Sequence, residues 1–233
     1  MCIKLFRALS CLAAILVLSA GSLHAQIYAE IGDAGQTLAT AQTTGVTSGQ
    51  LLISITGTIS GLNDADMFIL TLTSPMTFSA STVNGLTLVD TALFLFRSNG
   101  TGVYTNDDTN GTTLQSTLPA GTGFTISLSP GVYFLGISLS GNEPINLNSQ
   151  LLFNGFPGGD STAVRGPAAG INPATHSNFN GLAGFAEMGA YQINLTGAAT
   201  ASAIPEPSTT ALSAVAMTIL FLAWKRRQQE LRR

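Results

Sequence analysis

Four aspartates offer the most promising chemistry in this 233-residue chain: Asp64, Asp66, Asp107 and Asp108. Carboxylates that lie in short turns beside Asn side chains and loop carbonyls supply the hard oxygen ligands that Ca²⁺ prefers. Their spacing does not match the 12-residue loop of an EF-hand. Two interpretations therefore stay open, a calcium site or a set of Asx turns and strand caps, and we favour the second. Calcium is the one cofactor that the sequence suggests.

Candidates for catalysis are few. His176 is the only histidine outside the N-terminal leader described below, and a single histidine among Asn and Ser residues is typical of a solvated loop. Serine-type catalysis would need such a base beside a nucleophile. A glycosidase-like carboxylate pair could be drawn from Glu30, Glu143 and Glu187, but the sequence sets no distance between them. We therefore expect that the protein is not an enzyme.

Aromatic side chains could stack on sugars, and five of them deserve mention: Tyr104, Phe153, Phe156, Phe179 and Phe185. We assign the first two to the hydrophobic core and the other three to fixing a long loop. A sugar-binding module stays open as an alternative.

Charge excludes one class of partner. Residues 26–203 contain two basic residues, Arg97 and Arg165, and ten acidic ones, so their net charge is 2 − 10 = −8, against −3 for the whole chain. Nucleic acid carries the same sign, so we expect no nucleic-acid binding.

The last thirty residues, 204–233, carry the clearest signal. Pro205, Glu206 and Pro207 open a stretch, 207–224, that has no charged residue and that ends before Lys225, Arg226 and Arg227. As a helix these 18 residues would rise about 27 Å, close to the roughly 30 Å of bilayer hydrocarbon. Five of the nine basic residues follow Trp224, which places that end in the cytoplasm. We expect a transmembrane helix at 207–224 and export of everything before it.

The two prolines favour an extended strip outside the membrane, a shape that a protease cleft accepts. This order of Pro-Glu-Pro, apolar helix and basic cluster resembles the PEP-CTERM sorting domain of exopolysaccharide-producing Gram-negative bacteria. The resemblance covers Ile204–Arg227. It implies that an exosortase, an integral-membrane processing enzyme, recognises and removes the tail. It also implies a membrane-anchored precursor that is later sorted to the cell surface or the extracellular matrix.

The N-terminus has the pattern of a secretory signal. Lys4 and Arg7 precede an apolar run, and Ala25 offers a small residue at the cleavage point. Both cysteines, Cys2 and Cys11, lie within residues 1–25. The exported part therefore has no disulfide and no cysteine-based metal site, although it enters an oxidising compartment.

Between leader and tail, residues 26–203 alternate β-branched and polar residues with turns at short intervals, which is typical of an all-β sandwich. We expect an antiparallel, jelly-roll-like sandwich, flanked by the signal helix and the transmembrane helix. Gly57 suggests a bulge, and the Gly/Pro-rich stretch 154–184 predicts a long loop. The expected strands are Ile27–Ile31, Leu51–Ile59, Met67–Thr73, Met76–Thr82, Thr91–Phe96, Val103–Tyr104, Phe124–Leu128, Val132–Leu139, Leu147–Phe153 and Met188–Leu195.

The order of several short motifs in this body resembles the bacterial pre-peptidase C-terminal domain, a β-sandwich module of secreted proteins. The motifs are Asp64-x-Asp66-x-Phe68, Asp90 with Leu93-x-Leu95-Phe96, Asn99-Gly100, Asn106-Asp107-Asp108 and Ser127–Tyr133. The resemblance covers roughly Leu51–Ser140 and implies a secreted β-sandwich, with calcium bound near strand-opening acids in some relatives. The stretch 154–184 departs from the compact module.

Together these features predict an exported structural or adhesive protein of the cell surface or exopolysaccharide matrix. Its expected partners are an exosortase, the membrane during export, and exopolysaccharide. The alternatives are a carbohydrate-binding module and a hydrolase of matrix polysaccharide.

Overall fold

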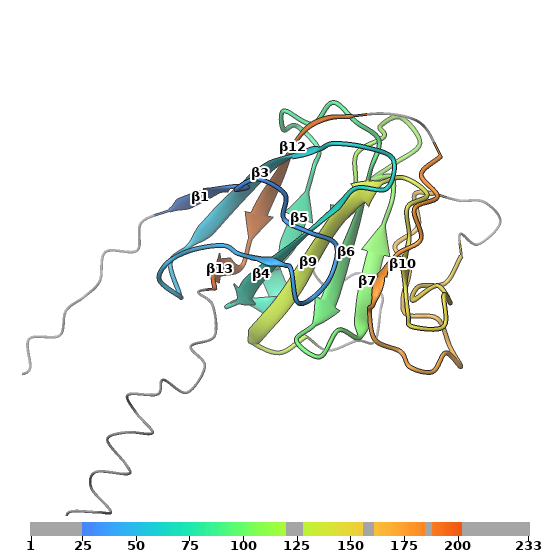
Figure 1. Ribbon diagram of the computed structural model, residues 1–233. Coiled ribbons are helices and arrows are strands. Elements are labelled where there is room, and N and C mark those ends of the chain that lie inside the picture. The colour runs from blue at the N-terminus through green and yellow to red at the C-terminus, as the bar shows by residue number, and fades with distance from the viewer. Residues whose placement is uncertain (1–24, 120–127, 156–160, 185–187, 202–233) are drawn as a thin grey trace, which may run out of the picture.

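Extended backbone accounts for nearly all the regular structure. The computed structural model describes residues 25–119, 128–155, 161–184 and 188–201 (Figure 1). The one helical element among these residues is a 3-10 turn, Pro75–Thr77, whose proline begins the turn. The prediction of an all-β body is confirmed.

The first sheet has five strands in the order β1-β3-β12-β5-β8. They are β1 (Gln26–Ala29), β3 (Leu52–Ile59), β12 (Gly189–Thr196), β5 (Ser79–Ser81) and β8 (Thr117–Leu118). Strand β12, late in the chain, pairs with β3 on one side and β5 on the other. The strand expected at Ile27–Ile31 is present as β1 at the edge of this sheet, where it runs parallel to β3.

The second sheet has six strands, with β13-β4-β9-β6-β7 in order and β2 added beside β4. Their bounds are β13 (Ala198–Thr200), β4 (Ala65–Leu72), β9 (Gly131–Leu139), β6 (Thr91–Arg97), β7 (Gly102–Asn106) and β2 (Gln42–Thr43). The long central strands are antiparallel, whereas β2 is parallel to β4, so both sheets are mixed.

The main hydrophobic core lies between the two sheets. Alternate residues of β4 face it, namely Phe68, Leu70 and Leu72, and Ile55 and Ile193 meet them from the first sheet. Each such side chain, when fully buried, contributes about 1.5–3 kcal/mol to the free energy of unfolding. This burial must stabilise a domain that has no disulfide.

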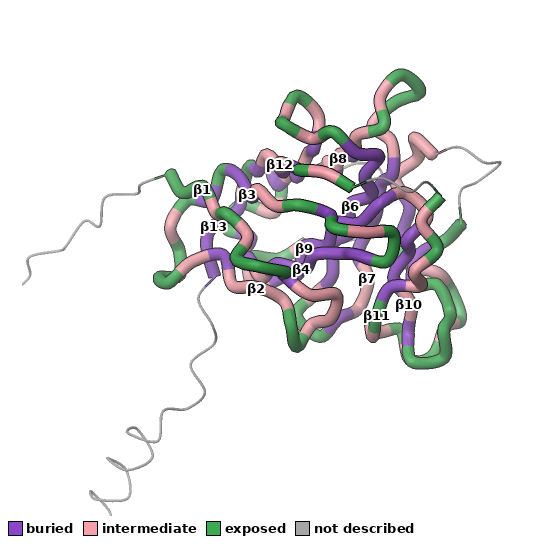
Figure 2. The backbone as a smooth tube through the Cα atoms, turned by 45° about the horizontal axis from the view of Figure 1, so that its top comes forward, coloured by how far each residue is buried: buried purple, intermediate pink, exposed green. Residues whose placement is uncertain are grey.

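A second core covers the opposite face of the second sheet. Phe94 and Phe96 of β6 point into it, and Phe153 and Phe179 close it from the irregular segments late in the chain. Those segments contain a small two-stranded sheet, β10 (Pro144–Ile145) with β11 (Asn178–Phe179), and lie beside β7 (Figure 1). Strand β6 is therefore buried on both faces, which explains its almost continuous apolar sequence. Purple runs along the central strands in Figure 2 show the same burial.

Three expectations for local structure need correction. The segment Leu147–Phe153 is not a strand, because Asn146 Oδ1 accepts the backbone N–H groups of Asn148 and Gln150, both at 2.9 Å, and holds a turn. The expected strand Met76–Thr82 begins later, at Ser79, since Pro75 starts the 3-10 turn. Gly57 makes no bulge and pairs in regular register with Tyr191.

Several predictions fall outside the described residues. They are the signal segment up to residue 24, nearly all of the strand expected at Phe124–Leu128, the Pro-Glu-Pro strip and the span at 207–224. Within the described ranges, no helix is long and apolar enough to cross a membrane.

Candidate functional site

The four aspartates proposed from sequence fall into two separate places. Asp64 and Asp66 lie at the start of β4, whereas Asp107 and Asp108 follow the end of β7. In the described part of the chain, one set of three acidic residues has carboxylate oxygens within 4.8 Å of one another: Glu30, Asp33 and Asp66. Of the four predicted aspartates, this set contains only Asp66.

The Glu30–Asp33–Asp66 group spans the surface and the interior. Asp33 is exposed, Glu30 is half-buried, and Asp66 is fully buried. Glu30 follows β1, and its Oε1 and Oε2 accept the backbone N–H groups of Ala34 and Thr58, both at 2.9 Å. Asp33 Oδ1 accepts the N–H of Gly35 at 2.8 Å. Backbone donors thus fix the two outer carboxylates over the inner one.

Asp66 is the residue that requires an explanation. Its Oδ2 accepts a hydrogen bond from the Tyr191 hydroxyl at 2.8 Å, but its buried Oδ1 has no hydrogen-bond donor among the described residues. The pKa of the Asp66 carboxyl is raised to about 8, mainly by burial; the Tyr191 bond opposes this rise, while the charges of Glu30 and Asp64 and a hydrogen bond with Glu30 add to it. Carboxylates this close together must share a proton or hold a cation.

Gly57 makes this arrangement possible. A Cβ at this position would lie 2.3 Å from the Tyr191 hydroxyl oxygen and 2.4 Å from Glu30 Oε2. The absence of a side chain in the middle of β3 therefore admits both groups to the space beside Asp66. Burial also raises the pKa of Tyr191 far above its usual value, so its hydroxyl stays a proton donor.

Asp64 has a different role from Asp66. Its Oδ2 accepts hydrogen bonds from the backbone N–H and from the hydroxyl of Ser60, the latter at 2.8 Å. It thereby closes the turn before β4, which is the capping role that we favoured from sequence.

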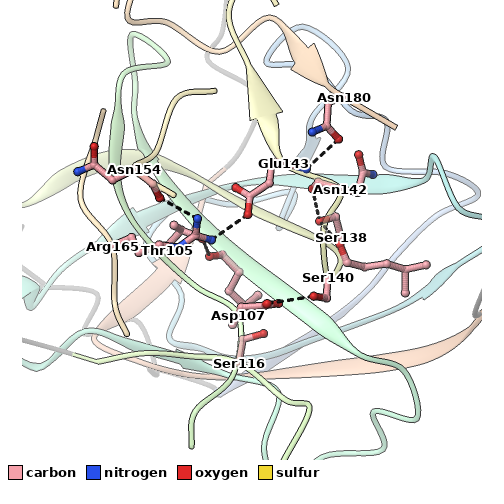
Figure 3. A network of polar contacts seen from close by, with 12 residues as sticks. Thr105, Asp107, Ser116, Ser138, Ser140, Asn142, Glu143, Asn154, Arg165 and Asn180 are labelled. Carbon is pink, nitrogen blue, oxygen red and sulfur yellow. Dashed lines mark hydrogen bonds and ion pairs between the residues drawn. The ribbon is translucent and has the colours of Figure 1, made fainter. Parts of the chain in front are cut away.

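Asp107 belongs to a second acidic network, shown in Figure 3. Its Oδ2 accepts the Ser140 hydroxyl at 3.0 Å, and its buried Oδ1 has no hydrogen-bond donor among the described residues. The pKa of Asp107 is raised to about 7, mainly by burial; the Ser140 bond opposes this rise, and the charges of Asp90, Asp108 and Glu143 add to it.

A buried ion pair fastens the late irregular segment at the same place. Arg165 Nη2 lies 2.8 Å from Glu143 Oε1, and its Nη1 donates to the backbone oxygen of Asn154 at 2.8 Å. Its backbone also pairs in both directions with Thr105 of β7. The pair is 3% and 10% exposed, so solvent screens it little (Figure 3). Its geometry is that of a structural clamp.

His176 is buried, not solvated as the sequence suggested. Its Nε2 lies 2.8 Å from the backbone oxygen of Gln36, and its ring centroid is 5.0 Å from that of Phe96 and 5.1 Å from that of Phe179. Burial lowers its pKa. None of these neighbours is a nucleophile, so the ring serves the second core.

The structure also gives no binding or catalytic role to the other residues that were considered from sequence. Tyr104, Phe153 and Phe179 are buried and offer no face to a sugar, while Phe156 and Phe185 lie outside the described residues. The candidate carboxylates Glu30 and Glu143 belong to the two different groups, and Glu187 is outside the described ranges.

An open hollow of about 320 Å³ has Glu30 in its lining, but neither Asp33 nor Asp66. Glu30 and Tyr191 line it together with Thr56, Thr58 and Ala190. Sequence reasoning considered Glu30 only as a catalytic acid and gave Asp33 no role. The one signal that could have revealed them is their spacing, Glu30-x-x-Asp33, directly after a strand.

Comparison with known proteins assigns no family: no protein-family model matches the chain, and neither does any curated protein. The class that fold and site define is therefore an all-β domain with a preformed carboxylate group at one edge.

Proposed function

We propose that this protein is an exported structural or adhesive module of the cell surface or exopolysaccharide matrix. In this proposal a β-sandwich with mixed sheets, not the purely antiparallel one expected from sequence, travels between a signal helix and a transmembrane helix, and an exosortase processes the precursor. The Pro205-Glu206-Pro207 strip, the uncharged run 207–224 and the basic residues 225–227 support the route. The all-β domain, with its order of motifs like the pre-peptidase C-terminal domain, is the part that is delivered.

The proposed module is stiffened by a divalent cation, and calcium fits the donors best. The observation that carries this step is Asp66 Oδ1, a buried oxygen without a hydrogen-bond donor in a group of three carboxylates. Ca²⁺ takes six to eight oxygen ligands and tolerates irregular geometry, and the group offers only oxygens. A cation there would join the segment after β1 to β4 and reduce repulsion within an acidic domain.

A hydrolase is the weaker candidate. Among the described residues, the two acidic groups lie apart, and Glu143 is paired with Arg165. Asp107 is buried and bonded to Ser140. We therefore assign no catalytic role to either group.

The delivery route is tested by following the precursor in its host. Glu206→Ala should leave the precursor at full length, whereas a substitution in the exposed turn, Thr112→Ala, should leave processing unchanged. Size on a denaturing gel reports the result. Normal processing of the Glu206 variant would contradict the sorting role.

The cation is tested by thermal unfolding of the full chain in a mild detergent. A free Ca²⁺ concentration of a hundred times Kd stabilises the folded state by about 2.7 kcal/mol. For a domain of this size, this corresponds to a rise in Tm of roughly 5–11 °C. Asp33→Asn removes the charge of one proposed ligand and should therefore abolish most of the shift. Because Asp33 is exposed, the substitution should otherwise change the stability little. Asp108→Asn, in the other acidic group, is the matched control and should keep the shift. No shift in the wild type on adding Ca²⁺ after chelation would end the cation proposal.

A further inference from the structure

Charge is divided between the two ends of the sandwich. Strands β4 and β6 both begin at one end, which we name the acidic end, and stop at the other, the exit end; β9 runs antiparallel to both. The turn between β3 and β4, the residues after β1 and β9, and the end of β7 all lie at the acidic end. Every acidic residue that the structure describes lies there: Glu30, Asp33, Asp64, Asp66, Asp90, Asp107, Asp108 and Glu143.

The exit end carries a base instead. In one row across the second sheet, Tyr133 of β9 pairs with Leu70 of β4 and with Arg97 of β6. Leu70 also pairs with Thr200 of β13, so Arg97 lies level with the last described strand. The only ion pair in the described part of the chain is at the acidic end, so Arg97 has no acidic partner there.

A loop without charged residues, 44–51, lies beside the point where the chain leaves the domain. The backbone N–H of Thr200 donates to the backbone oxygen of Gln50 at 2.8 Å, and its hydroxyl donates to the backbone oxygen of Thr47 at 2.6 Å. These bonds fix the loop to β13. Val46, in the middle of the loop, is fully exposed.

Other aliphatic side chains are exposed around the exit end. Ile27 lies at the start of β1, Leu51 precedes β3, and Met76, which is 82% exposed, lies in the 3-10 turn after β4. Exposed aliphatic residues also occur at the acidic end, but carboxylates lie among them there. At the exit end, no carboxylate of the described residues accompanies them.

The length of the connection to the tail decides which end can reach a membrane. The predicted span begins at Pro207, six residues after Ala201, so a fully extended connection covers about 20 Å. The nine residues of β9 span about 30 Å, so the sandwich is longer than this connection. Figure 1 shows β1 and β13, the first and last described strands, on the same side of the domain.

The surface of a bilayer suits the chemistry of the exit end. Exposed aliphatic side chains and uncharged loops enter the headgroup region at low cost, and a basic side chain is attracted to anionic headgroups. Carboxylates are repelled by the same headgroups. The division of charge therefore favours one orientation of the anchored domain.

We propose that, in the membrane-anchored precursor, the exit end rests on the lipid surface and the acidic end points away from it. Val46 and Met76 lie at headgroup level, and Arg97 lies beside anionic lipid phosphates. This inference rests on the transmembrane anchor proposed above and adds the surface by which the domain meets the membrane.

The test uses the full chain, with Cys2 and Cys11 replaced by serine, in vesicles that contain a phospholipid spin-labelled on its headgroup. A fluorophore is attached through Val46→Cys at the exit end or through Leu62→Cys, an exposed position in the turn between β3 and β4 at the acidic end. The fluorophore at position 46 should lose most of its intensity, and the one at position 62 should keep most of it, because about 30 Å separates the two ends. Equal quenching at both positions overturns the orientation.

Trp224, the only tryptophan of the chain, reports on the anchor in the same samples. If Trp224 is quenched and the two fluorophores do not differ, this inference alone fails. If Trp224 is not quenched, the proposed transmembrane anchor fails as well.

Arg97 provides the second arm. In vesicles with added phosphatidylglycerol, Arg97→Gln should lower the ratio of docked to undocked domain, read from the fluorophore at position 46, by about fivefold. Arg97→Lys keeps the charge and should match the chain that retains Arg97. Equal quenching in the Gln and Lys variants overturns the placement of Arg97 at the lipid surface.

Discussion

Gly57 is the single position whose substitution best tests the geometry of the carboxylate group. In Gly57→Ala, the added Cβ would lie 2.3 Å from the Tyr191 hydroxyl oxygen, whereas ordinary contacts begin at 3.4 Å. One partner must therefore withdraw by about 3.4 − 2.3 = 1.1 Å. Tyr191 is 1% exposed and has little space to move, and a shift of that size exceeds what its 2.8 Å bond to Asp66 can absorb.

The magnitude follows from three opposing effects. Overpacking in a filled interior costs about 1–3 kcal/mol, and a buried acceptor that loses its donor costs about 1–3 kcal/mol more. Alanine in the interior of a strand recovers about 0.5–1 kcal/mol relative to glycine. We expect a net loss of about 1–5.5 kcal/mol, or roughly 2–22 °C in Tm.

Urea unfolding at pH 7 measures this loss, and Gly61→Ala is the matched control. Gly61 precedes the same carboxylate region, has no left-handed backbone, and its added Cβ would have no neighbour within 4 Å. Its free energy of unfolding should stay within about 0.5 kcal/mol of that of the wild type. If Gly57→Ala behaves like Gly61→Ala, then Tyr191 and Glu30 do not meet over Gly57, and the carboxylate group is not built as described.

Three further predictions concern the rest of the domain. The folded-state pKa of Asp107 is raised to about 7, so between about pH 4 and pH 7 the folded protein holds a proton that the unfolded chain has released. The contribution of this group to stability therefore falls as pH rises from about 4 to about 7. In a pH series of urea unfolding experiments, Asp107→Asn should flatten this fall and should be more stable than the wild type by roughly 1–3 kcal/mol at about pH 8. Arg165→Met leaves Glu143 buried without its partner and should cost about 3–5 kcal/mol by the same assay, with Glu143→Gln in addition restoring part of the loss; an effect below 1 kcal/mol would mean that the pair is solvated. His176→Ala should cost about 2–4 kcal/mol because its ring packs on Phe179, whereas a solvated loop histidine would cost under about 0.5 kcal/mol.

Much of the fold could be predicted because period-2 alternation is a local signal. The strands predicted at Met67–Thr73 and Val132–Leu139 are present as β4 and β9, and their alternate apolar residues lie in the main core. The segment Leu147–Phe153 was wrongly predicted as a strand because its apolar residues match a strand pattern. The side chain of Asn146 instead closes a turn there. Periodicity along the sequence does not predict that a layer of irregular segments is buried against a sheet.

The candidate site could not be predicted as a whole. Asp66 was found because it opens a strand, but Glu30 and Asp33 reach it only through the parallel pairing of β1 with β3, a contact between distant segments. His176 failed for the same reason: its polar sequence neighbours indicate solvent, yet Phe96 and Phe179 enclose it from elsewhere in the chain.

The two acidic places have the same mechanical role in a part of the chain, residues 25–201, that contains no cysteine. Loops bear the greatest ordering cost, and small exported domains usually offset it with disulfides. Here one buried polar anchor holds each irregular segment: the Glu30–Asp33–Asp66 group fixes the chain after β1, and the Glu143–Arg165 pair fixes the segment that covers the second core. Neither anchor is fully satisfied by hydrogen bonds among the described residues, because Glu143 Oε2 and Asp66 Oδ1 are both buried acceptors without a donor. The two anchors differ in charge balance: Arg165 neutralises Glu143, whereas the first group contains three carboxylates.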